Sequence, residues 1–291
     1  MHELPEFDVY SPSTLRDALT CLSGKRRGWK LLAGGTALIP EMLREGSDIQ
    51  MMVDLSGLSE LRYVRRTGKT IRIGGLTTIS ELVDSELLDG KYSCFKRLGR
   101  HYGSVATRNM ATVGGNIASG TGDLLEILLA LEGSVVVRSA KDKREADPTN
   151  LDLQADEVVV EAHFEELGGS VSTWFNKFEK RRGGGKGVAT TTTLLKLGEG
   201  QAVEDVRIVV SCARGNKFGR AYKAEAELSG KIANSRTIGR ALEALESEMR
   251  PLGDYLASAR FRKVLAMSMV REGLTECLKQ LADGEKMEAK G

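Results

Sequence analysis

The sequence offers little material for a metal centre. It contains 4 cysteines and 3 histidines among 291 residues, and successive cysteines lie about 65 to 120 residues apart with no C-x-x-C pair. Zinc ribbons and iron–sulfur clusters take several ligands from one short segment. We therefore expect no metal site, and we interpret Cys21, Cys94, Cys212 and Cys277 as free thiols, wholly or partly buried, in a reducing compartment. The chemistry is then expected to come from an organic cofactor.

The sequence also lacks an excess of either charge and any long apolar run. Its 42 basic and 40 acidic residues leave a net charge of +2. This near-neutral charge gives no indication of binding to nucleic acid or to an anionic membrane. No segment approaches the roughly 18 apolar residues of a transmembrane helix, and residues 1–6 do not resemble a signal peptide. We expect a soluble, cytoplasmic protein. At 41% hydrophobic and 28% charged residues, the chain is long enough for about two globular domains.

Apolar spacing predicts a small unit of strands and helices at the start of the chain. Apolar residues recur at helical spacing over 14–23, after a candidate N-cap at Ser13 or Thr14. The other elements expected here are strands at 29–33 and 51–55 and a helix over 38–43.

From about residue 58 the pattern changes to alternating strands. The first two strands form a hairpin with its turn at Gly68, and Leu167–Ser170 is the expected linker between domains. A broad apolar stripe over 254–281, which includes Phe261 and Val264, is expected to be core. The remaining expected elements are helices at 79–88, 94–102 and 124–131 and strands at 134–138, 157–164, 189–197 and 206–213.

Two glycine-rich turns are the most informative segments. In the first, Leu31–Leu38, paired glycines follow a strand and precede a helix, so backbone N–H groups and the positive helix end can meet an anion such as pyrophosphate. The second, Thr112–Asp123, repeats this combination of paired glycines, hydroxyls, an amide and a carboxylate before a helix. A side chain at Gly35 or Gly115 is expected to occupy phosphate space. Two such loops could hold opposite ends of a long anionic cofactor.

Neither turn is a common nucleotide motif. Both lack the G-x-G-x-x-G spacing, which disfavours a Rossmann fold. The run Gly183–Gly187 is not a P-loop, because no Ser or Thr follows its lysine, and it is expected to be a mobile surface loop.

The two turns together closely resemble the FAD-binding (medium) subunit of the molybdenum hydroxylases, the family of xanthine dehydrogenase, carbon monoxide dehydrogenase and aldehyde oxidoreductases. The resemblance rests on Ala33-Gly-Gly-Thr and on Arg108-Asn-Met-Ala-Thr-Val-Gly-Gly-Asn. It continues through Val53-Asp-Leu, Ile73-Gly-Gly-Leu-Thr-Thr and Ser258-Ala-Arg-Phe-Arg-Lys, and so covers nearly the whole chain. It implies an α+β protein: a PCMH-type (VAO-like) FAD-binding fold of two α/β subdomains, followed by a CO-dehydrogenase-flavoprotein-like α+β domain.

The resemblance also implies a domain plan. The FAD-binding domain would span 1–166, with subdomains of about 1–57 and 58–166, and the C-terminal domain would span 170–285 before a short tail at 286–291.

The same resemblance implies roles for individual residues. The first turn would lie along the FAD pyrophosphate; Thr112 would lie near the phosphates, Asn116 toward the ribityl and flavin, and Asp123 would hydrogen-bond the ribityl chain. Tyr102 matches an aromatic that stacks on adenine, and Lys177 matches a basic residue near the flavin ring. We name no catalytic residue, since the flavin supplies the redox chemistry. The expected cofactor-binding residues are Leu32, Ala33, Gly34, Gly35, Thr36, Ala37, Leu38, Tyr102, Thr112, Gly114, Gly115, Asn116, Asp123, Val159 and Lys177.

The implied function is electron transfer within a complex. Electrons from a molybdenum-cofactor large subunit would reach this FAD through a [2Fe–2S] small subunit, and leave to NAD+, a quinone or another acceptor. The chain departs from the family in a shorter interval from Asn116 to Asp123, which bears on the role of Asp123. It also departs in Arg181-Arg-Gly-Gly-Gly-Lys, so the acceptor identity cannot be transferred. Two alternatives stay open: a self-contained FAD oxidoreductase, and a structural subunit that has lost FAD.

Overall fold

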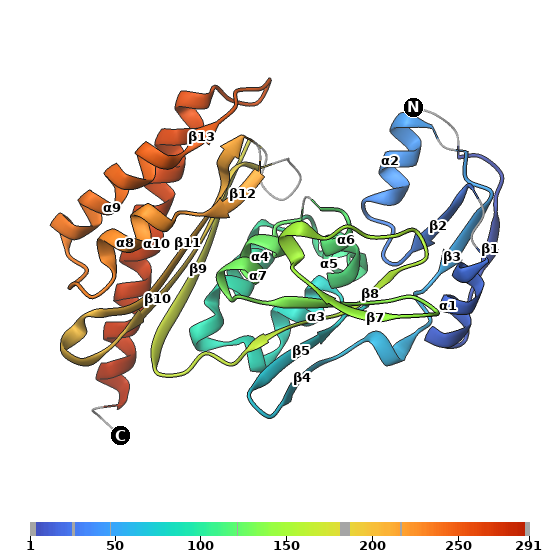
Figure 1. Cartoon of the computed structure of the whole chain (residues 1–291), viewed down its shortest axis with the longest axis horizontal. Coiled ribbons are helices and arrows are strands. Elements are labelled where there is room, and N and C mark those ends of the chain that lie inside the picture. Colours follow the sequence, from blue (N-terminus) through green and yellow to red (C-terminus); the bar gives the residue numbers. More distant parts are fainter. Residues whose placement is uncertain are drawn as a thin grey trace. The chain divides into compact units, whose positions relative to one another are not determined.

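The computed structural model describes residues 4–24, 27–46, 48–120, 122–180, 187–215 and 217–288, with side chains from 212 to 217 and beyond 284 left out (Figure 1). The expected glycine-rich loop, apart from Gly187, and the Cys212 side chain lie outside this description. Internal contacts divide the chain into two compact units. The first contains Met1–Leu87, Ser104–Leu125 and Gly133–Glu165; the second contains Leu88–Gly103, Glu126–Glu132 and Glu166–Gly291. Both units draw on separate stretches of chain, and the contiguous domain plan 1–166 and 170–285 stays a prediction.

The first unit begins with a parallel three-stranded sheet in the order β1-β3-β2. Thr14 caps α1 by accepting a hydrogen bond from the N–H of Asp17 at 3.1 Å, as one of the two candidate caps predicted. The elements are β1 Asp8–Tyr10, α1 Leu15–Ser23, β2 Trp29–Leu32, α2 Leu38–Glu45 and β3 Met51–Asp54.

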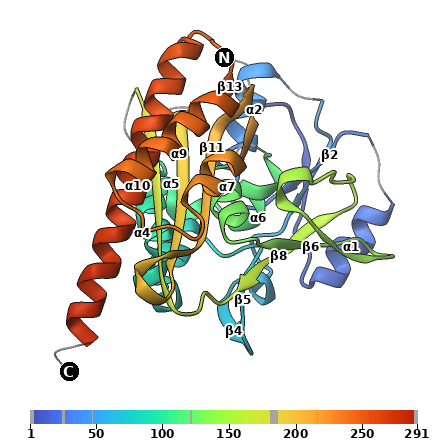
Figure 2. The same ribbon diagram turned by 60° about the vertical axis from the view of Figure 1, so that its left-hand side comes forward.

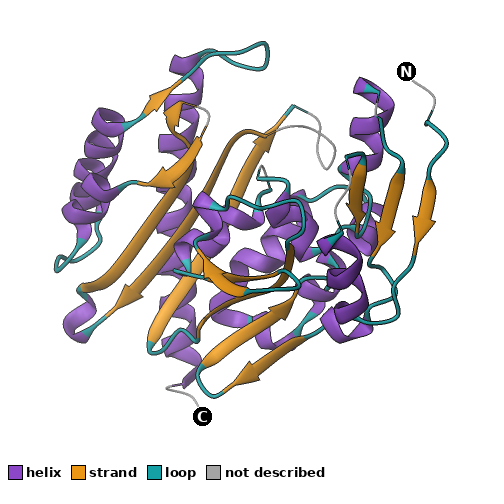
Figure 3. Ribbon diagram, turned by 45° about the vertical axis from the view of Figure 1, so that its right-hand side comes forward, coloured by secondary structure: helices purple, strands orange, loops and turns teal. Residues whose placement is uncertain are grey.

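The rest of the first unit is built on an antiparallel five-stranded sheet in the order β4-β5-β8-β6-β7. Gly68, at φ +61°, makes the expected hairpin turn between β4 and β5. Figure 3 shows the short helices of this part beside the sheet. Its elements are β4 Val64–Thr67, β5 Thr70–Gly74, α3 Ile79–Asp84, α5 Val105–Met110, α6 Val113–Ala118, β6 Ser134–Arg138, β7 Lys143–Ala146 and β8 Val158–Glu165. The helix α7 Leu124–Ala130 begins in this unit and ends in the second.

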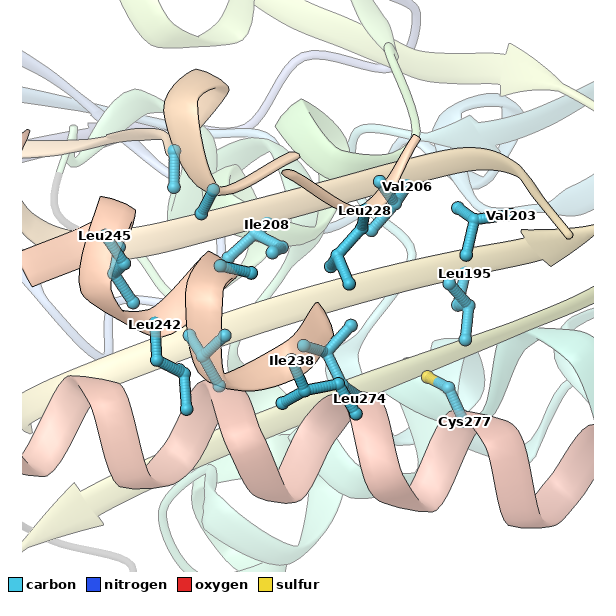
Figure 4. Packing of buried hydrophobic residues seen from close by; sticks show 14 of the residues in the cluster. Leu195, Val203, Val206, Ile208, Leu228, Ile238, Leu242, Leu245, Leu274 and Cys277 are labelled. Carbon is cyan, nitrogen blue, oxygen red and sulfur yellow. The ribbon is translucent and has the colours of Figure 1, made fainter. Parts of the chain in front are cut away.

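The second unit carries an antiparallel sheet in the order β12-β11-β10-β9, with the short β13 parallel to β11. The helices α9 and α10 run along one face of it (Figure 2). Leu195 and Ile208 of the sheet, Leu242 of α9 and Leu274 of α10 meet in one buried cluster (Figure 4). The elements are α4 Ser93–His101, β9 Ser170–Glu179, β10 Gly187–Leu197, β11 Val203–Gly215, β12 Lys217–Arg220, α8 Tyr222–Leu228, α9 Ser235–Glu248, β13 Arg250–Pro251 and α10 Ala259–Glu288.

The sequence pattern missed one strand of this unit and misjudged one helix. Ser170, the last residue of the expected linker, begins β9, a ten-residue strand that the pattern did not predict. The stripe over 254–281 is not core throughout: α10 begins at Ala259, and Phe261 and Val264 in its first turns are 48% and 60% exposed. Within the described ranges, no helix combines the length and apolar character that a membrane crossing needs.

Candidate functional site

The first glycine-rich turn connects β2 to α2 and leaves its backbone donors open. Among the described residues, none accepts a hydrogen bond from the N–H groups of Gly34, Gly35, Thr36, Ala37 or Leu38. The first donor of the helix that is paired is Ile39, whose N–H reaches the Gly35 carbonyl at 3.0 Å. Gly35 adopts φ +67°, a left-handed conformation that glycine accepts without strain. Successive open N–H groups of this kind form a nest for an anion.

The helix that follows adds to this preference for negative charge. Ala37 is the N-cap of α2, and no side chain bonds to the first turn. Pro40 lacks an N–H at the third position, where a cap would otherwise be needed. Glu41 brings one acidic side chain to the same turn, but the open N–H groups and the positive end of the helix dipole favour an anion there. The turn therefore fits a phosphate or pyrophosphate group.

The second turn uses its backbone differently. Thr112 is the N-cap of α6, and its Oγ1 accepts a hydrogen bond from the Gly115 N–H at 3.2 Å. The neighbouring N–H groups are also paired: Val113 donates to Thr77 at 2.9 Å, Gly114 to Gly75 at 2.7 Å and Asn116 to Thr112 at 2.9 Å. The start of α6 is thus held within the protein, so contacts from this turn to a ligand depend on side chains.

The first turn touches the backbone immediately before the second turn. A β-carbon built at Gly34 would overlap the carbonyl oxygen of Met110 and stand 2.6 Å from its carbonyl carbon. One at Gly114 would stand 2.8 Å from the Gly75 oxygen and 3.0 Å from the oxygen of Val159 in β8. The first turn, the second turn and β8 therefore meet in the first unit, where they bring together most of the expected cofactor-binding residues: Leu32, Ala33, Gly34, Gly35, Thr36, Ala37, Leu38, Thr112, Gly114, Gly115, Asn116, Asp123 and Val159.

These distances give a further reason for the glycines, beside the expected phosphate contact, which stays a prediction. A β-carbon at Gly35 would meet Leu32 at 3.1 Å and Ile39 at 3.3 Å, and one at Gly115 would meet Thr112 Oγ1 at 2.9 Å. The interior of the protein therefore leaves little room for a side chain at either position, and Gly35 is also favoured by its φ of +67°. The sequence analysis also missed Gly75 and Gly122, whose bare α-carbons lie against Val159 and Asn116. The Ile73-Gly-Gly segment marked Gly75, but its partner could not be read from spacing.

The remaining two expected residues belong to the second unit. Tyr102 is the C-cap of α4 and is partly buried. Lys177 lies in β9, its side chain is only 10% exposed, and its Nζ is 3.8 Å from Oε2 of Glu179. Lys177 is therefore not a solvated surface lysine. No group of three or more His, Cys, Asp or Glu side chains suited to a metal occurs in the part of the chain that the structure describes.

Two known families match successive parts of the chain. Residues 5–162 match the family described as the FAD binding domain in molybdopterin dehydrogenase. Residues 175–277 match the CO dehydrogenase flavoprotein C-terminal domain. The two matches follow each other in the order expected from the sequence motifs.

Individual relatives match over almost their full length. The chain is 29% identical to the nicotine 6-hydroxylase medium subunit of Paenarthrobacter nicotinovorans, over 94% of this chain and 98% of that protein. It is 24% identical to the carbon monoxide dehydrogenase medium chain of Hydrogenophaga pseudoflava, over 93% and 96%. Solved structures of carbon monoxide dehydrogenase from that organism and of quinoline 2-oxidoreductase from Pseudomonas putida 86 each share the fold with a TM-score of 0.88. Each alignment covers 96% of this chain and 99% of the solved chain. The sequence identity is 24% for the carbon monoxide dehydrogenase chain and 20% for the quinoline 2-oxidoreductase chain.

Proposed function

Because the chain belongs to the FAD-binding family of the molybdopterin dehydrogenases, we propose that it carries electrons through FAD between the partner subunits of a molybdenum hydroxylase and an external acceptor. The chain is a FAD-binding, medium-type subunit of this oxidoreductase family. The single observation that carries the proposal is the match to both family domains, over residues 5–162 and 175–277.

The geometry of the first turn supports FAD as the group that it holds. The open N–H groups of Gly34 to Leu38 and the uncapped start of α2 would hold the pyrophosphate. Thr112 would present its hydroxyl hydrogen to the same phosphates, since its oxygen already accepts from Gly115. FAD, when bound, supplies transfer of electrons singly or in pairs, and this chain's residues orient it and tune its potential.

The partners follow from the same proposal. Relatives are named as medium chains or FAD subunits, and a medium chain needs further subunits to bind and oxidise a substrate. We assign to those subunits a molybdenum cofactor and [2Fe–2S] clusters, from which electrons would pass to this FAD. NAD+, a quinone or another carrier would then take them. We expect the complex in the cytoplasm.

Flavin content is the first test of this function. The purified chain should show a visible flavin spectrum and release close to one FAD per chain on denaturation. A colourless chain that takes up no added FAD would instead favour the structural subunit without cofactor.

Association with partners separates the other alternative. Affinity purification from the native host should recover a molybdenum-containing and an iron–sulfur-containing chain with this one. A flavin-loaded chain that oxidises a small substrate by itself, with no partner recovered, would favour the self-contained FAD oxidoreductase.

A further inference from the structure

The strand β9 lies at one end of the sheet in the second unit, and its outer edge is closed by side chains. β9 pairs with β10 from Ser170 to Glu179, and within the described residues no strand pairs with its other side. Backbone groups of β9 that do not face β10 therefore point outward along this edge. A row of such N–H and C=O groups, when open, can pair with a strand of another molecule.

The helix α4 lies against this edge and binds two of its outward carbonyls. Ser93 Oγ donates a hydrogen bond to the Thr173 carbonyl. Arg97 Nε donates to the Phe175 carbonyl at 2.6 Å. The side chain of Thr173 is tied to the same helix, because its Oγ1 accepts from the N–H of Cys94 at 3.3 Å. One helix thus closes two successive outward positions of β9.

The next outward position is closed from within the strand. The N–H of Lys177 donates to Oδ1 of Asn176 at 3.0 Å, and the Asn176 amide nitrogen donates to Oε2 of Glu272 in α10 at 2.9 Å. Oε1 of Glu272 also lies 3.9 Å from a terminal nitrogen of Arg97. The closed positions keep the two-residue period of a strand edge, so three successive outward residues of β9 have a bonded backbone group.

Arg97 is a costly residue at this position. Its side chain is only 15% exposed, and its guanidinium carbon lies 3.5 Å from the centre of the Trp174 ring. Burial lowers the pKa of Arg97, because the charged group is removed from water, and the Glu272 carboxylate opposes this shift. Proteins use charges directed inward at a strand edge to prevent strands from pairing there.

The composition of β9 indicates what would pair with an open edge. Residues 170–178 contain two β-branched and three aromatic residues, one lysine, and neither proline nor glycine, and with Glu179 the strand has no net charge. Segments of this composition readily form strand pairs between molecules. A second copy of the chain carries the same edge, and two antiparallel copies of β9 can pair about a two-fold axis. β9 is therefore complementary to itself.

We infer that α4 covers the edge of β9 to prevent it from pairing with β9 of a second copy of this chain, and that Ser93 and Arg97 hold the helix in this place. The edge is then a self-association surface that the fold keeps closed. This inference depends on neither the cofactor nor the proposed function. A chain that loses these two contacts should pair with itself.

Three variants open the edge, and two controls leave it closed. Ser93→Ala, Arg97→Ala and the double variant with both changes remove donors to the edge carbonyls. Arg100→Ala removes the same charge from an exposed position of α4. Leu242→Ala weakens the buried core at α9, whose main contacts are with α8 and α10. This second control shows what a loss of stability does by itself.

Two measurements are made on each purified chain. Sedimentation over a range of concentrations gives its dimerisation constant. Titration with a fluorescent peptide of residues 170–179 tests whether the edge accepts a strand. A second peptide with proline in place of Phe175 is the control, because it lacks the N–H that pairing needs at that position.

The edge variants should dimerise at least about tenfold more tightly than wild type. They should also bind the β9 peptide but not its proline form, whereas Arg100→Ala and Leu242→Ala should behave as wild type in both measurements. Circular dichroism and the melting temperature show which variants fold, and the folded edge variants provide the test. The inference is overturned if no folded edge variant shows both properties. It is also overturned if Leu242→Ala self-associates as strongly as they do, because lost stability alone would then explain the pairing.

Discussion

The α-carbon of Gly34 lies against the carbonyl group of Met110, two residues before the N-cap Thr112. A β-carbon at position 34 would overlap that oxygen and stand 3.1 Å from the α-carbon of Ala111. The first turn is therefore in direct contact with the backbone that leads into the second turn, although 76 positions separate Gly34 from Met110 in the sequence. A change at this contact is therefore expected to move the open N–H groups of the first turn relative to Thr112.

We predict that Gly34→Ala separates the turns and weakens FAD binding. The added methyl group must displace one backbone from the other, and groups that hold one pyrophosphate tolerate little displacement. FAD and ADP affinities should both fall by about tenfold or more, equivalent to about 1.4 kcal/mol. Isothermal titration of the apo-protein measures this loss, with Gly57→Ala as control, because a β-carbon there meets nothing within 4 Å. Unchanged ADP affinity in a folded Gly34→Ala protein would show that the contact does not position the phosphate site.

Substitutions at Thr112 should separate its capping role from its expected contact with phosphate. Thr112→Ala removes the acceptor for Gly115 and should cost about 1 kcal/mol in the free energy of unfolding. Thr112→Ser should restore both stability and FAD affinity. Thr112→Asp keeps a good N-cap but brings a negative charge toward the phosphates, so it should fold normally and bind FAD more weakly, with the deficit shrinking at high salt. Denaturant unfolding and FAD titration at two salt concentrations test this series; normal FAD affinity in Thr112→Asp would remove Thr112 from the phosphate site.

Local patterns in the sequence were enough to predict several elements but not their contacts. The helix cap at Thr14 and the turn at Gly68 depend on residues close together in the chain, and both expectations agree with the structure. The strand β9 was missed because Ser172, Thr173 and Asn176 interrupt its apolar pattern, although Ser172 and Thr173 are buried. Their burial depends on neighbours such as α4 and β10, which a local pattern does not contain.

The glycine-rich turns show the same division within the site. Their composition predicts backbone donors for an anion; the first turn has open N–H groups of this kind, whereas those at the start of α6 are paired within the protein. The partner of each glycine could not be predicted, because Met110, Val159 and Asn116 approach their glycines only through the tertiary fold. The exposure of Phe261 and Val264 was missed for a related reason: periodicity identifies an apolar stripe but not how far the sheet beneath it extends.

The same glycine-to-alanine change should have opposite effects in two helices of the second unit. In α9, a β-carbon at Gly239 meets nothing within 4 Å, so Gly239→Ala should stabilise the protein by about 0.5–1 kcal/mol through helix propensity. In α10, a β-carbon at Gly273 would stand 2.6 Å from Oγ1 of Thr193, which is fully buried. Overpacking there should cost about 1–3 kcal/mol and outweigh the gain in propensity. Urea unfolding of the two variants tests this contrast, and stabilisation by Gly273→Ala would contradict the packing of α10 on β10.

The two buried thiols should make stability fall at alkaline pH. Burial raises the pKa of Cys94 and of Cys277 from the ordinary value of 9.0 to about 12. Each pKa is higher in the folded than in the unfolded chain, so the stabilisation is complete below pH 9 and is lost as the pH rises toward 12. Over this interval the unfolded state releases thiol protons that the folded state retains, which should lower the free energy of unfolding by about 1.4 kcal/mol per pH unit for each thiol.

Comparison of variants isolates this effect from other groups that titrate in the same range. Between pH 9 and 12, Cys94→Ala and Cys277→Ala should each make the free energy of unfolding fall less steeply with pH, by about 1.4 kcal/mol per pH unit. This holds whatever each substitution does to stability at neutral pH. Cys21→Ala is the control with a partly exposed thiol. Alkylation followed by peptide mapping gives an independent measurement. At pH 8 an alkylating reagent should modify Cys21 of the folded chain well before Cys94 or Cys277, because the thiolate is the reactive form. Equal rates at all three thiols in the folded protein would be incompatible with the burial of the α4 and α10 cysteines.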